Sequence, residues 1–172
     1  QAIVHEPQVL ILDEPTKGLD PRQIVQMREL VQRLGGTHTV LLSSHQIGEV
    51  ERVADYVAIL HAGHLIAVDR LDELKHSTRQ LTITVEDARS PVPAMEGEII
   101  HQRLRGRQWE VIVRDLEPTT IERVRFANGI VAVESRTPSL EEIFVAYVAT
   151  PPITTVAVAT ATTIESGRSG NG

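Results

Sequence analysis

The sequence contains no cysteine and few aromatic residues. Aromatic side chains make up 3% of its 172 residues. The absence of cysteine excludes disulfide bonds and thiolate metal sites, and it is compatible with a reducing compartment. Hydrophobic residues still make up 41% of the chain. We therefore expect one core, or two small ones, built almost entirely from aliphatic side chains.

The sequence also lacks a long apolar run and an excess of basic residues. No stretch approaches the roughly 20 apolar residues that span a bilayer, and no secretory signal peptide is visible. The net charge is −6, which argues against a nucleic-acid partner. The chain starts with Gln1 rather than methionine, and we expect it to be the carboxyl-terminal part of a longer protein.

The most informative stretch is VLILDEPTKGLD, residues 9–20. Its aliphatic run has no polar alternation, which predicts a strand buried on both faces, as in parallel α/β sheets. Two carboxylates, Asp13 and Glu14, follow directly. Ligands bind such sheets just beyond the carboxyl ends of the strands, so these acids are candidates for chemistry. The alternative is an ordinary strand end followed by a turn at Pro15.

This stretch resembles the Walker B segment and D-loop of ABC-type ATPases. The resemblance implies that Asp13 helps to hold Mg²⁺, mostly through water, and that Glu14 is the catalytic base that orients the attacking water. It also implies that Asp20 acts at the interface between two ATPase domains and belongs to the ATP-binding set. Lys17 departs from the small residue often found at its position, which puts details of that interface in doubt. Asp20 has a second interpretation, since Asp20, Pro21 and Gln23 form a helix N-cap pattern.

His45 is the second candidate catalytic residue. It follows the apolar run 39–42 and two serines, one predicted helix and one predicted strand after the acids. A single histidine in a soluble domain is most often a surface or core residue. In ABC ATPases, however, a histidine at this point contacts the terminal phosphate of ATP. The joint occurrence of the acids and SSH strengthens the resemblance, which implies ATP and Mg²⁺ as cofactors bound with the help of Asp13, Glu14, Asp20 and His45.

Other motifs of that family are absent from the sequence. There is no G-x-x-x-x-G-K-[ST], so the chain has no backbone cradle or lysine for the phosphates. The family's signature motif and Q-loop are also missing. We therefore expect the chain alone to bind nucleotide poorly and to be inactive as an ATPase.

We expect three regions: residues 1–76 as the distal part of an ABC ATPase domain with a partial parallel P-loop sheet, 77–148 as a small α+β domain, and 149–172 as a disordered tail. The second region resembles the accessory domain of ATP-binding subunits of ABC-2-type exporters, and its mixture of elements suggests a ferredoxin-like sandwich. The expected helices cover 21–34, 46–54, 71–76, 118–126 and the residues after Ser139, with a helix end at 1–6; the expected strands cover 9–12, 39–42, 56–60, 65–68, 80–86, 98–104, 108–114 and 130–134.

Taken together, these resemblances imply an ATP-hydrolysing subunit of an ABC transporter, and we expect it to serve an exporter. Its partners would be a second ATP-binding subunit and a transmembrane permease, and it would lie peripherally on the cytoplasmic face of the plasma membrane. Two alternatives remain: a non-transport ABC ATPase, or an inactive truncated interaction module. His61 and His64 have a spacing that suits a metal, but without a third ligand we interpret them as a solvated pair in a hairpin.

Overall fold

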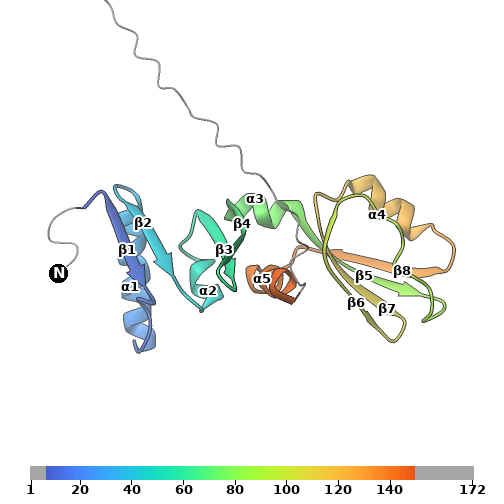
Figure 1. Cartoon of the computed structure of the whole chain (residues 1–172), viewed down its shortest axis with the longest axis horizontal. Helices are drawn as coiled ribbons and strands as arrows, with labels where there is room; N and C mark the ends of the chain where they lie inside the picture. Colours follow the sequence, from blue (N-terminus) through green and yellow to red (C-terminus); the bar gives the residue numbers. More distant parts are fainter. Residues whose placement is uncertain (1–6, 150–172) are drawn as a thin grey trace, which may run out of the picture.

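The computed structural model describes residues 7–149. Its elements form an elongated row (Figure 1), with β1, β2 and α1 at one end and a four-stranded sheet with α4 at the other. The hairpin β3–β4 lies between them together with α2, α3 and α5. The helix end predicted for residues 1–6 and the tail predicted beyond residue 149 lie outside the described residues, while Ala149 itself closes helix α5.

The first unit is a parallel strand pair joined by a helix. Strand β1 (Val9–Asp13) pairs in register with β2 (Thr39–Ser43), and α1 (Pro21–Gly35) makes the crossover. The predicted parallel pair is therefore confirmed. Helix α1 begins where the sequence indicates, because Asp20 and Gln23 form a complete capping box and Pro21 occupies the first turn.

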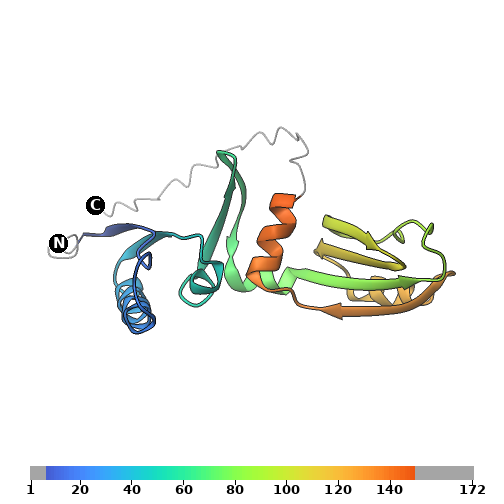
Figure 2. The same ribbon diagram turned by 90° about the horizontal axis from the view of Figure 1, so that it is seen from below.

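The prediction that β1 is buried on both faces is wrong for the described residues. Only Leu10 of this strand is buried, whereas Val9 and Ile11 are 55% and 70% exposed. On β2, Leu41 is 60% exposed. The physical reason is that this sheet has two strands and α1 lies on one side of it (Figure 2). Alternate side chains of the aliphatic run consequently face solvent.

The second unit is an antiparallel hairpin. Strands β3 (Tyr56–His61) and β4 (His64–Arg70) pair across the turn at Ala62 and Gly63, which both have positive φ as tight hairpin turns require. Helix α2 (Ile47–Val50) is shorter than the predicted 46–54 and continues as irregular turns. No side chain caps its start, and Gly48 lowers its helix propensity.

Helix α3 (Leu71–Ser77) leads directly into a four-stranded sheet. All neighbouring strands in this sheet are antiparallel, and their order is β6-β7-β5-β8. The core on one face consists of aliphatic side chains, as the scarcity of aromatic residues predicts. The elements of this unit are β5 (Thr78–Val85), β6 (Glu98–Arg105), β7 (Gln108–Arg114), α4 (Pro118–Arg125) and β8 (Ile130–Arg136).

The ferredoxin-like description of this unit is not confirmed. That fold has two helices, one after its first strand and one before its last. Here α4 precedes β8, but residues 86–97 after β5 form a loop without helix. The loop contains two prolines, Pro91 and Pro93, which remove backbone donors and disfavour helix. The strand order alone is compatible with the prediction.

Helix α5 (Leu140–Ala149) returns from the sheet to the hairpin unit (Figure 2). Its Leu140 and Ile143 share a buried cluster with Val57, Leu71 and Leu74. Its Ala146 packs on the other side against Ile100 and Ile112 of the sheet. The helix therefore contributes to the cores of both units. The boundary at residue 77 remains a prediction.

A polar contact joins the same two units. Asp69 of β4 and Arg114 of β7 form an ion pair at 2.8 Å, with both side chains 22% exposed. The Arg114 guanidinium donates to the Asp69 carboxylate, which raises the pKa of Arg114 above its usual range, and Tyr147 of α5 also hydrogen-bonds this group. The elements β4, β7 and α5, which are distant in the sequence, therefore meet at the Arg114 guanidinium.

Candidate functional site

The candidate catalytic residues meet at the carboxyl ends of β1 and β2. The strands are parallel, and Asp13 lies directly opposite Ser43 in the register. Both strands therefore end at the same edge, where Glu14 follows β1 and His45 follows β2. Glu14 has φ +45°, a conformation uncommon for residues other than glycine. Its backbone N–H donates to the Ser43 carbonyl at 3.0 Å, which holds this turn against β2.

Glu14 and His45 are in direct contact. The backbone N–H of His45 donates to Glu14 Oε1 at 3.0 Å, and His45 Nδ1 lies 2.8 Å from the same oxygen. The His45 side chain is 68% exposed, whereas that of Glu14 is 27% exposed. The second carboxylate oxygen, Glu14 Oε2, is buried without a hydrogen-bond partner in the described part of the chain. Glu14 thus has one oxygen fixed by His45 and one acceptor still available.

Ser43 belongs to the same group, although sequence reasoning did not single it out. Its hydroxyl donates to Asp13 Oδ1 and accepts from the Glu14 backbone N–H at 3.3 Å. The available signal was the position of Ser43 at the end of the strand next to the acids. We refer to Asp13, Glu14, Ser43 and His45 as the strand-end cluster.

The contacts of Asp20 link it to α1 instead. Its Oδ1 accepts from the backbone N–H groups of Arg22 and Gln23, both at 2.9 Å. The capping interpretation of Asp20 is therefore confirmed, and an additional interface role is left as a proposal. Nearby, Lys17 donates its backbone N–H to the Glu14 carbonyl, closing the turn after the acids.

The strand-end cluster can supply part of the ligands of a Mg²⁺ ion, and waters and substrate phosphates would supply the rest. Among residues 7–149 no group of three His, Cys, Asp or Glu residues could hold a metal by itself. Mg²⁺, however, is commonly bound by one or two carboxylates together with waters and substrate phosphates. Asp13 is exposed at the strand end and supplies such a carboxylate. The unpartnered Glu14 Oε2 also suits a bound water. His61 and His64 pair across the β3–β4 turn, and their interpretation as a solvated pair stays a prediction.

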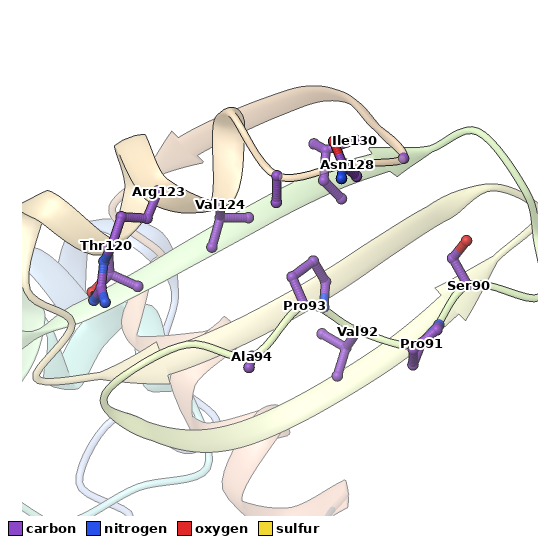
Figure 3. Close-up of a pocket in the computed structure, with 12 residues that line it drawn as sticks. Ser90, Pro91, Val92, Pro93, Ala94, Thr120, Arg123, Val124, Asn128 and Ile130 are labelled. Atoms are coloured by element: carbon purple, nitrogen blue, oxygen red, sulfur yellow. The ribbon is translucent and has the colours of Figure 1, made fainter.

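A cavity of about 600 Å³ lies in the four-stranded unit, far along the chain from the strand-end cluster. It opens between the loop 90–94 and α4 (Figure 3). Its walls are mainly apolar, with Arg123 at one side held by Thr120 and Glu96. The cavity is lined by residues that include Pro91, Val92, Pro93, Thr120, Val124 and Ile130. None of the candidate catalytic residues lines this cavity. We place the candidate site at the strand ends because the acids and the imidazole converge there.

No helix among residues 7–149 has the length and apolar character needed to cross a bilayer. No family model matches the chain.

Curated proteins do match it. The bacitracin transport ATP-binding protein BcrA of Bacillus licheniformis is 40% identical over 99 residues, covering 56% of this chain and 32% of that protein. The daunorubicin resistance ATP-binding protein DrrA3 of Streptomyces coeruleorubidus is 31% identical over 157 residues, covering 83% of this chain and 48% of that protein. The phosphate import ATP-binding protein PstB 1 of Yersinia pestis is 41% identical over 80 residues, covering 46% of this chain and 30% of that protein.

These matches differ in how much of the chain they include. The match to DrrA3 covers 83% of the chain, which is more than either expected domain contains, so it extends over both. The chain spans less than half the length of each of these three relatives. All three are named as ATP-binding proteins, for bacitracin transport, daunorubicin resistance and phosphate import. The chain is therefore a relative of the ATP-binding subunits of ABC transporters, sharing sequence with part of their length.

Proposed function

We propose that the chain is the distal part of an ATP-hydrolysing subunit of an ABC transporter. The observation that supports this best is the contact between Glu14 and His45 next to Asp13, at the edge of a parallel strand pair. Phosphoryl transfer depends on charge neutralisation and an oriented nucleophile more than on covalent chemistry by the protein. One edge of the strand pair carries a carboxylate that can bind a metal for charge neutralisation. It also carries a second carboxylate and an imidazole that can orient the nucleophile.

Each residue then has a distinct role. Asp13 would hold Mg²⁺, and the metal would supply neutralisation of the charge on the phosphates. Glu14 orients the attacking water, and reaching it requires a turn of the carboxylate, because Oε1 is held by His45 and Oε2 is buried without a partner among the described residues. His45 holds Glu14 Oε1 through its backbone N–H and Nδ1. The exposed remainder of its ring is available to the terminal phosphate. Asp20 acts at a contact with a second ATP-binding subunit.

The partners and location follow from the same proposal. The protein that contains this chain, here called the whole protein, would pair with a second ATP-binding subunit and a transmembrane permease. It would lie peripherally on the cytoplasmic face of the membrane. We propose an exporter, because one of the relatives whose match covers more than four fifths of the chain is named as a daunorubicin resistance protein. The phosphate import match covers 46% of the chain.

The test is ATP hydrolysis by the whole protein. Replacing Glu14→Gln removes the base but leaves the phosphate-binding residues intact, so turnover should fall by about 100-fold or more. Equilibrium binding of ATP should be retained. Glu29→Gln is the matched control, because Glu29 is an exposed acid on α1. Normal hydrolysis by Glu14→Gln would refute the role of Glu14.

The 172-residue chain should be inactive by itself, since it has no glycine-rich cradle for the phosphates. Titration with Mg²⁺–ATP, followed by calorimetry, should give no saturable binding up to millimolar concentrations. Measurable turnover by this chain would show that its own residues suffice for nucleotide binding, against this proposal.

A further inference from the structure

We propose that Ser43 is a positioning residue for both acids of the strand-end cluster, setting the orientation of Asp13 toward a divalent cation. This inference rests on the proposed function and adds to it a residue that the motifs did not identify. Ser43 acts on Asp13 and Glu14 through hydrogen bonds.

The strand register places the Ser43 hydroxyl beside the first acid. Asp13 and Ser43 are directly opposed on parallel strands, and the Ser43 hydroxyl donates to Asp13 Oδ1. A hydroxyl has a single proton to donate. That proton is committed to Asp13, which fixes one carboxylate oxygen and leaves Oδ2 to face a cation or its water shell.

The same residue holds the second acid. The Glu14 backbone N–H is directed toward both the Ser43 carbonyl, at 3.0 Å, and the Ser43 hydroxyl, at 3.3 Å. The carbonyl bond is the better of the two by distance. Together they hold Glu14 at φ +45°, a conformation that persists only when its surroundings fix it. The lone pairs and the proton of one serine therefore link the two acids that the proposed reaction uses.

This arrangement resembles the role of outer hydrogen-bond partners at metal sites in general. Such groups orient the carboxylates that bind the metal, and their loss typically lowers metal affinity or activity about 10- to 100-fold. Ser44, the next residue, makes a different contact: its hydroxyl accepts from the Gln46 backbone N–H at 3.0 Å. The two serines therefore provide a matched pair for experiment.

The experiment uses the whole protein with Mn²⁺ as the probe and a non-hydrolysable ATP analogue. Free Mn²⁺ is measured by electron paramagnetic resonance. Ser43→Ala should weaken Mn²⁺ binding in the presence of the analogue by about 10-fold. Ser43→Thr keeps the hydroxyl and should restore affinity to within about threefold. Ser44→Ala, with the same loss of an oxygen, should leave Mn²⁺ affinity close to that of the unmodified protein.

The outcomes separate this inference from the proposed function. Unchanged Mn²⁺ affinity in Ser43→Ala, or an equal loss in Ser44→Ala, would overturn the role of Ser43 while leaving the proposed function intact. If the unmodified protein binds no Mn²⁺ with the analogue, the proposed function fails, and this inference fails with it. Thermal unfolding of each variant shows whether a loss of affinity reflects a loss of folding. Ser43→Cys keeps the side-chain shape but replaces the hydroxyl with a weak donor, so it should also weaken Mn²⁺ binding and provides the test if Ser43→Ala does not fold.

Discussion

His45 Nδ1 lies 2.8 Å from Glu14 Oε1, and the backbone N–H of His45 donates to the same oxygen at 3.0 Å. Two groups of one residue thus hold one oxygen of a carboxylate that comes from a neighbouring strand. The contact depends on the parallel register of β1 and β2, because that register brings both strand ends to one edge.

This contact predicts the effect of removing the imidazole. In the whole protein, His45→Ala should lower the ATP turnover rate by about 100-fold, the scale expected when a positioning group is lost. The loss arises because Glu14 Oε1 then keeps only the backbone N–H of residue 45 as a donor, and the phosphate loses the imidazole. Steady-state hydrolysis measures it. His64→Ala, at the exposed first residue of β4, should have little effect, and comparable losses in both variants would argue against a special role for His45.

Asp20 allows its two roles to be separated. Asp20→Ala removes the α1 cap and should lower the free energy of unfolding by about 1 kcal/mol. Asp20→Ser retains a capping side chain and should preserve stability. Urea unfolding of both variants measures the capping role. If Asp20 also acts at a subunit contact, Asp20→Ser should lower ATP turnover in the whole protein without loss of stability, whereas unchanged turnover would restrict Asp20 to capping.

The junction between the hairpin and the four-stranded sheet should depend on Asp69. Asp69→Asn weakens the ion pair with the partly buried Arg114, and we expect a loss of about 1 to 2 kcal/mol in the free energy of unfolding. Asp115→Asn is the control, since that carboxylate is 71% exposed and lies 3.8 Å from Arg114 Nε. Equal effects of the two substitutions on urea unfolding would indicate that the Asp69 contact adds no stability.

Glu142 should make stability depend on pH in the acid range. Its hydrogen bond with Arg136 lowers the pKa of this carboxyl from 4.5 to about 2. A lowered pKa in the folded state means that the stabilising effect is complete above pH 4.5 and is lost as the pH falls toward 2. The side chain is 39% exposed, so screening should keep the effect to about 1 kcal/mol or less.

The variant Glu142→Gln tests this dependence. Glutamine keeps the capping box with Ser139 but carries no charge for Arg136. Urea unfolding between pH 5 and pH 2 should therefore vary less with pH in this variant, whereas Glu141→Gln, at a neighbouring exposed acid, should behave as the unmodified chain. Identical pH profiles for Glu142→Gln and the unmodified chain would contradict the prediction.

Local patterns in the sequence predicted most of the elements. The Asp20 capping box, the Ala62–Gly63 turn and the Ser139–Glu142 capping box all form as the residue types indicate. The partly buried Trp109 packs against the aliphatic cluster from strand β7 and donates its indole N–H to the Ser90 carbonyl. These features depend on neighbours within a few residues or on strand alternation, which a single sequence contains.

What the sequence could not predict depends on distant neighbours. The apolar run at Val9–Leu12 indicates a strand, but its burial depends on how many strands and helices surround it. The contact of Ser43 with Asp13 depends on a register across 30 residues, and no local pattern distinguishes Ser43 from Ser44. The absence of helix in 86–97 agrees with the expected elements, which place no helix there, and only the ferredoxin-like description required one.

The placement of α5 has a practical consequence for exchanging parts between related proteins. The helix follows the sheet in sequence, yet Leu140 and Ile143 complete the cluster around Leu71 and Leu74. A chimera that replaced residues 77–149 as a block would give the recipient hairpin a foreign helix. Hybrid proteins should therefore retain the native residues 140–149 and, in the transplanted strands, keep Ile100 and Ile112, which pack against Ala146.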